Sequence, residues 1–67
     1  SLANYMKYNY KYDTNKRMIE SQTMKWNSYK NNWENDLLVR YTYEGKLLLQ
    51  TIINGITGKV NLYWLRR

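Results

Sequence analysis

The sequence predicts an all-β domain, an antiparallel up-and-down meander of about five strands built from hairpin repeats. Over long stretches, aromatic or aliphatic residues alternate with polar ones, and this period of two is typical of strands with one buried face. Between these stretches lie short segments rich in asparagine and glycine, which suit tight turns. Because the connections are short, we expect sequential strands to pair with each other.

Each expected strand is a run of alternating residues bounded by a turn signal. In the first run, Tyr8, Tyr10 and Tyr12 alternate with polar residues. Tyrosine, tryptophan and threonine, which are frequent in this chain, suit the pleated surface of a sheet. The five expected strands cover residues 5–12, 17–27, 33–43, 46–54 and 59–65.

The turns follow from local chemistry. The segment 13–16, Asp-Thr-Asn-Lys, predicts a three-residue hairpin loop, in which a type I turn precedes a residue in the left-handed conformation. Lys16 takes that left-handed position at a modest cost, because glycine would suit it better. Further turns are expected at 27–32, 44–46 and 54–59, where asparagine or glycine recurs.

One segment, 33–41, also permits a helix. Asn32 is able to cap it, and Trp33, Leu37 and Tyr41 follow at the i, i+4, i+8 spacing of one helical face. Val39, Thr42 and the two tyrosines, Tyr41 and Tyr43, favour a strand. We therefore prefer a strand here and keep the helix as the alternative.

The 67 residues are expected to form a single small β domain, 1–67. A chain of this size buries only about 60% of the surface that its unfolded form exposes. It contains no run of roughly 18 apolar residues and no signal-peptide pattern. Because the chain does not begin with methionine, we expect Ser1 and Leu2 to lie outside the natural sequence. We expect the rest to be a fragment of a longer repeat protein.

A motif of Tyr-x-Tyr-acid, a turn, a basic residue and an apolar residue occurs twice, at 10–18 and 41–48. Between the two copies, Trp26 and Trp33 flank a loop rich in asparagine, serine and lysine. With these residues the chain resembles the YTYD/W-loop-W β-hairpin repeat, similar to YD repeats, of secreted and envelope proteins of Bacteroidetes-type bacteria. The resemblance covers 10–48 and implies an extended all-β module, secreted, periplasmic or at the cell surface, with an unknown ligand.

The residues argue against an enzyme. The chain contains neither histidine nor cysteine, so a nucleophile–base triad and the usual zinc ligands are missing. Glu34 and Asp36 are expected on the same side of a strand, like the carboxylate pair of a glycosidase. A glycosidase also needs a substrate cleft, which so short a chain cannot build. We therefore expect solvated carboxylates facing lysines, and we predict no catalytic, cofactor or metal site.

A binding role is the preferred hypothesis, as a non-enzymatic structural or binding module whose ligand is a glycan or a protein surface. The alternative is a small basic domain that binds nucleic acid, because the net charge is +6 and lysines interleave with aromatic rings. We prefer the first hypothesis because strand alternation alone produces that interleaving. The candidate ligand contacts are Tyr10, Tyr12, Trp26, Trp33, Tyr41 and Tyr43.

Self-association is the remaining expectation. The segment 46–53, Lys-Leu-Leu-Leu-Gln-Thr-Ile-Ile, is the most apolar in the chain. A five-stranded meander has two faces, and no helix is expected that would cover either of them. An apolar face must then close into a barrel, pack on a second copy or continue into flanking repeats. The simplest assembly is a two-fold dimer.

Overall fold

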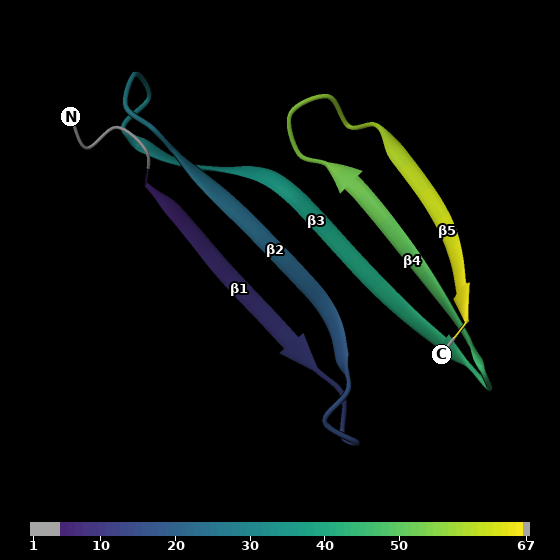
Figure 1. Ribbon diagram of the computed structural model, residues 1–67. Helices are drawn as coiled ribbons and strands as arrows, with labels where there is room; N and C mark the ends of the chain where they lie inside the picture. Colours follow the sequence, from purple (N-terminus) through teal and green to yellow (C-terminus); the bar gives the residue numbers. More distant parts are fainter. Residues whose placement is uncertain (1–4, 67) are drawn as a thin grey trace.

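The computed structural model describes residues 5–66, which form one five-stranded antiparallel sheet with the strands in chain order (Figure 1). The remaining residues, 1–4 and 67, lie outside this range, and so does the expectation about Ser1 and Leu2. The strands are β1 (Met6–Tyr12), β2 (Met18–Asn27), β3 (Asn32–Glu44), β4 (Leu47–Asn54) and β5 (Val60–Arg66).

The predicted fold class is confirmed. Each observed strand begins and ends within one residue of its predicted bounds, and every pair of neighbouring strands is antiparallel. The segment 33–41 lies inside β3 and is therefore a strand, so the helical alternative is wrong. Pairing with β2 on one side and β4 on the other outweighs the helical spacing of three side chains in this segment.

The β1–β2 connection is the predicted three-residue loop. The Lys16 backbone N–H donates to the Asp13 carbonyl at 3.0 Å, and Lys16 has a φ of 64°. The Asp13 carboxylate accepts from the backbone N–H groups of Asn15 at 2.8 Å and Arg17 at 2.9 Å. An aspartate that bonds its own turn in this way stabilises the loop despite the left-handed lysine.

The β3–β4 connection is a tight turn of two residues, Gly45 and Lys46. Gly45 has a φ of 58°, and a glycine with positive φ at the first central position is the arrangement of a type II′ turn. Turns of this type match the twist of the two strands that they join. The turn predicted at 44–46 is therefore observed.

The β2–β3 and β4–β5 loops share one construction at the same end of the sheet (Figure 1). The Asn27 side-chain oxygen accepts from the backbone N–H groups two and three residues later, at 2.9 and 3.1 Å. The Asn54 side chain does the same, at 2.9 Å for both bonds. Four residues after each asparagine, the backbone is left-handed, with φ of 58° at Asn31 and 75° at Gly58. We call these two connections the asparagine loops.

The two faces of the sheet carry different aromatic residues, as the register and the alternation of side chains require. We call one face the tyrosine face; its tyrosines are Tyr8, Tyr10, Tyr12, Tyr41, Tyr43 and Tyr63. We call the other face the tryptophan face; its tryptophans are Trp26, Trp33 and Trp64.

The sheet is a single layer within the described part of the chain. Val39, in the middle of β3 on the tyrosine face, is 9% exposed and is the one buried hydrophobic residue among those described. Tyr41 and Tyr43 follow it on the same face and are half-buried, whereas the residues between them are exposed. β1 and β5 are exposed along their whole lengths. The centre of the tyrosine face is therefore the nearest approach to a core.

A β-bulge bends β3 where the β4–β5 loop approaches it. The register pairs Thr23 with Leu37 and Met24 with Asn35, so Asp36 is an extra residue. Figure 1 shows β3 changing direction along its length.

The Gly55 backbone N–H donates to the Asp36 carbonyl at 2.9 Å. A Cβ on Gly55 would overlap the Asn35 carbonyl group and lie 2.7 Å from the Asn35 Cβ. Only glycine allows this close approach.

We predict that Gly55→Ala lowers the free energy of unfolding by about 1–3 kcal/mol, because the new methyl group meets backbone that cannot yield cheaply. The control is Gly58→Asn, which sits in open space and takes the conformation that Asn31 already adopts in the matching loop. We expect the control to cost less than about 1 kcal/mol, since asparagine tolerates positive φ. Urea unfolding followed by tryptophan fluorescence measures both, and equal costs would contradict the close-approach argument.

Candidate functional site

The six predicted ligand contacts fall into two sets on opposite faces of the sheet. Four lie on the tyrosine face, and two lie on the tryptophan face. The sheet separates the sets, so one small ligand cannot contact all six residues. The tyrosines are Tyr10, Tyr12, Tyr41 and Tyr43, and the tryptophans are Trp26 and Trp33.

The two tryptophans form the tighter of the two sets. Trp26 on β2 pairs directly with Trp33 on β3, beside the first asparagine loop. Their ring centroids are 5.4 Å apart with an interplanar angle of 74°, an edge-to-face contact of the kind that aromatic pairs prefer. The Lys7 ammonium lies 4.8 Å from the centroid of the Trp33 ring, in a cation–π contact. These contacts hold both rings in defined positions.

A row of side-chain amides lies next to the tryptophan pair on the same face. The Asn9 amide donates to the Gln22 oxygen at 3.3 Å, and the Gln22 amide donates to the Asn35 oxygen at 2.7 Å. Each amide is both donor and acceptor, so the row retains sites for a polar ligand. Regular alternation places Asn9 and Gln22 on one face, whereas the position of Asn35 depends on the bulge after it. No motif or periodic pattern in the sequence pointed to any of these three residues.

The tyrosine set has a different environment. The Tyr43 hydroxyl donates to the Met18 carbonyl at 2.7 Å, and the Arg17 guanidinium lies 4.5 Å from the centroid of the Tyr43 ring. Arg17 in turn pairs with Asp13, with 2.8 Å between Nε and Oδ2. Tyr43 therefore ties β3 to the first hairpin loop, across β2. Tyr43, which was predicted to contact a ligand, therefore has a structural role.

The other tyrosines of the candidate set are arranged along the sheet. Tyr10 and Tyr12 lie on the edge strand β1 and are 50% and 57% exposed. Tyr41 lies in the middle of the sheet, opposite Gln50, which in turn pairs with Tyr63 on β5. With β1 exposed along its whole length and Tyr63 48% exposed, the set forms a broad, open surface.

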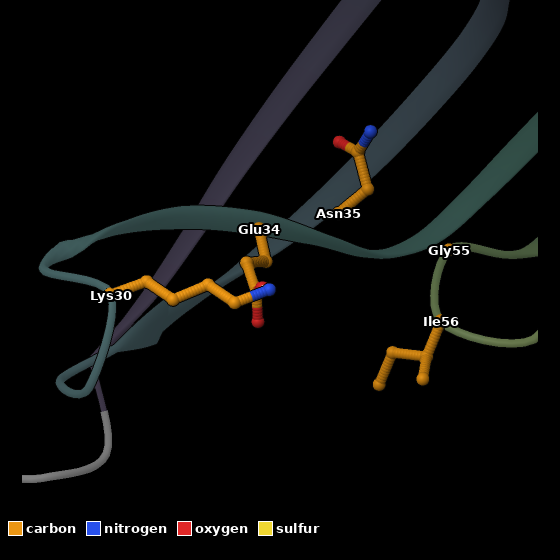
Figure 2. A pocket seen from close by; sticks show the side chains of 5 residues that line it. All are labelled: Lys30, Glu34, Asn35, Gly55 and Ile56. Atoms are coloured by element: carbon orange, nitrogen blue, oxygen red, sulfur yellow. The ribbon is translucent and has the colours of Figure 1, made fainter.

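A shallow hollow of about 370 Å³ lies between the two asparagine loops (Figure 2). Figure 2 shows the Lys30 and Glu34 side chains lying together on the side of Ile56, whereas Asn35 points to the other side of β3. Lys30 and Glu34 form an ion pair of 3.3 Å, and the Asn27 amide donates to Glu34 at 2.8 Å. The Glu34 carboxylate is therefore already bound by two partners.

Glu34 and Asp36, the two acids expected on the same side of a regular strand, lie at the bulge of β3. Glu34 pairs across the sheet with Lys25, whereas the bulge leaves Asp36 without a register partner. The expectation that Glu34 faces lysine holds, because Lys30 contacts it.

Two carboxylates have lowered pKa values because donors surround their charged forms. The pKa of Asp13 lies below its ordinary 3.8, chiefly because the Arg17 backbone N–H donates to it, with further support from the Arg17 guanidinium. The pKa of Glu34 lies below its ordinary 4.5, first because of the Asn27 amide and then because of Lys30. In the charged state, both carboxylates stabilise loops by accepting these hydrogen bonds.

The described residues contain no cluster of three or more potential metal ligands of the histidine, cysteine or acidic type. Nor do residues 5–66 include a helix with the length and apolar character needed to cross a membrane.

A model of one protein family matches residues 1–55, and this match decides the relationship. The chain belongs to the DUF3836 family, a family of unknown function. The crystal structure of a DUF3836 family protein from Bacteroides vulgatus ATCC 8482, at 2.50 Å resolution, has a similar fold, with a TM-score of 0.69 and 40% sequence identity. The match covers 94% of this chain and 69% of that one. No curated protein matches the chain.

The resemblance to YD-like repeats is therefore wrong, because the family that matches is DUF3836 and no YD-repeat family does. The structure gives a physical reason. The two Tyr-x-Tyr-acid segments end in different turns, a three-residue loop bound to Asp13 and a two-residue turn at Gly45. Alternation with tyrosine is common to many sheets, and it produced the similarity between the segments.

We predict that the carboxyl carbons of Asp13 and Glu34 titrate below pH 3.8 and 4.5, respectively, in NMR spectra of the folded protein. A lowered pKa stabilises the folded state above the ordinary pKa, and this contribution is lost as the pH falls through the folded-state value. Asn27→Ala should raise the pKa of Glu34 more than Lys30→Met does, because the amide bond is the larger cause. Neither variant should move Asp13, and the reverse order would contradict the assignment.

Proposed function

We propose that the chain is a non-enzymatic structural or binding module of a secreted, periplasmic or cell-surface protein, and that the tryptophan face binds a glycan. A protein surface is the second class of ligand that this face suits. Fractionation of cells that carry a tagged full-length protein tests the location, and a cytosolic pool would contradict it. The observation that carries the proposal is the tryptophan pair beside a row of amides.

The chemistry of that face suits a sugar. A sugar ring presents apolar C–H groups on its faces and hydroxyl groups around its edge, so its recognition requires an aromatic surface and donors and acceptors beside it. Trp26 and Trp33 supply the aromatic surface, and Asn9, Gln22 and Asn35 supply amide groups. The Trp64 ring, 58% exposed on β5, adds a further aromatic position on the same face.

The environments of three of the five acidic side chains support a role without catalysis. Asp13 is bonded within its own turn, Glu20 lies between Lys11 and Arg40, and Glu34 is bonded to an amide and a lysine. General acid–base catalysis at neutral pH favours a carboxylic acid with a raised pKa, whereas the two shifts resolved for this chain are downward.

Nucleic-acid binding, the alternative, has weaker support. Ion pairs engage four of the cations, which are Lys11, Arg17, Lys30 and Arg40. Lys7 lies over a tryptophan ring, and other lysines, Lys16, Lys46 and Lys59, lie in or beside turns. Binding of a nucleic-acid backbone requires a continuous row of free cations beside the stacking rings. The positive charge of this chain is instead distributed around the sheet.

A glycan array, with single-stranded oligonucleotides added as probes, tests the proposal. We expect a glycan signal that changes little between about 50 and 200 mM salt, whereas any binding to oligonucleotides should fall steeply over that range because of counterion release. Trp26→Leu and Trp33→Leu should each weaken glycan binding by roughly three- to tenfold, the value of one aromatic contact.

The matched controls are Tyr10→Leu and Tyr41→Leu on the opposite face, which should leave glycan binding unchanged. Circular dichroism confirms that each variant retains its sheet. Salt-sensitive binding to oligonucleotides without any glycan signal would favour the alternative. Loss of binding in the tyrosine variants alone would place the ligand on the other face.

A further inference from the structure

The register-paired residues of the tyrosine face carry no charge over three successive cross-strand rows; Asp36, in the bulge, has no register partner. Bulky apolar or aromatic residues are present in each row, together with neutral polar residues. The rows are Tyr8–Thr23–Leu37–Asn54, Tyr10–Ser21–Val39–Ile52–Asn61 and Tyr41–Gln50–Tyr63. Charged residues on this side lie at the ends of the sheet, such as Glu34 near one asparagine loop and Arg17 near the first turn.

The tryptophan face carries charge in its central row, which lies between the uncharged rows Gln22–Leu38–Ile53–Val60 and Thr42–Leu49–Trp64. Its central row begins Lys11–Glu20–Arg40, with N–O distances of 3.3 and 3.4 Å, and the lysine and arginine side chains are 69% and 60% exposed. Covering this row with another protein layer would remove water from three charges, which is costly. Covering the uncharged rows of the tyrosine face would not require removing water from charged groups.

The chain exposes more surface than a compact monomer of the same mass, and the excess is close to the area that one partner buries in a stable interface. The chain exposes 5488 Å² of surface. A compact monomer of 8.3 kDa exposes roughly 4,600 Å². The excess, about 900 Å², is close to the roughly 800 Å² that each partner buries in a stable interface of standard size. One face of a sheet with principal extents of 45 × 25 × 16 Å offers this area.

We propose that the tyrosine face of a second copy covers the tyrosine face of the first, so that two sheets form a β-sandwich with two-fold symmetry. In a two-fold interface the same patch meets itself, and a charged patch would then bring like charges together. The uncharged rows avoid this repulsion. Half-exposed tyrosines also suit an interface, because their rings bury a large area and their hydroxyls bond at the rim.

The dimer leaves both tryptophan faces outward, so it does not depend on the proposed glycan binding. Val39 and Ile52, at the centre of the tyrosine face, would become the middle of the core. Aligned sheets in such sandwiches pack about 10 Å apart at a small angle. A chain with one buried hydrophobic residue among those described thereby gains a core from its partner.

Neighbouring residues on β5 provide a matched pair of variants. Tyr63 is 48% exposed on the tyrosine face, and Trp64 is 58% exposed on the tryptophan face. Sedimentation velocity over a range of concentrations measures the dimer dissociation constant. We expect Tyr63→Lys to raise it by roughly 30-fold or more, since the lysine would be buried without a partner. Trp64→Lys should leave it within about threefold, because that side chain stays in water.

Hydroxyl-radical footprinting of the unmodified protein provides a measurement that does not depend on whether a variant folds. As the protein concentration rises through the dimer transition, Tyr10, Tyr12 and Tyr63 should become protected while Trp64 remains reactive. A monomer at every concentration would overturn the proposal. Protection of Trp64 would overturn it as well, and so would a Trp64→Lys variant that dissociates while Tyr63→Lys does not. Glycan binding by a strict monomer would retain the proposed function and reject only the dimer.

Discussion

The bulge at Asp36 is the constraint on which the arrangement of side chains in this sheet depends. In a regular strand, Trp33 and Tyr41 are an even number of residues apart and would share a face. One extra residue between them reverses the alternation, so the tryptophan lies on one face and the tyrosine on the other. The Gly55 N–H bonds the Asp36 carbonyl, and the lack of a side chain on Gly55 permits this approach. The β4–β5 loop therefore holds the bulge in place.

This separation gives each face its own chemistry. The tryptophan face combines a ring pair, a row of amides and the ion-paired row centred on Glu20, all of which are compatible with water and a polar ligand. The tyrosine face is uncharged across its centre and contains Val39, the buried hydrophobic residue. The apolar face of a sheet is stabilised when another layer packs against it. This difference between the faces underlies both proposals, the dimer through the tyrosine face and the glycan site on the tryptophan face.

The local structure was predictable where one residue bonds to its own neighbours. Asp13 accepts from backbone groups within its turn, and Lys16 takes the left-handed conformation that the turn type requires. The structure that recurs in this chain is the asparagine loop, at Asn27 and Asn54, rather than the Tyr-x-Tyr-acid motif. The motif suggested the wrong family because alternating tyrosines reflect the pleat of any sheet. An asparagine that hydrogen-bonds two backbone N–H groups is harder to recognise from the sequence than a strand, because it produces no periodic pattern.

By itself, the sequence determined the five strands, their order and the positions of the turns, because period-two alternation and asparagine or glycine signals act over a few residues. It also excluded the chemistry that needs histidine or cysteine. Only the tertiary structure decided which aromatic residues share a face. That choice depends on the pairing of β2 with β3 and on the Gly55 contact with the bulge, which join residues far apart in the chain. A shift of one residue in register moves every later side chain to the opposite face, so the composition of each face is a property of the assembled sheet.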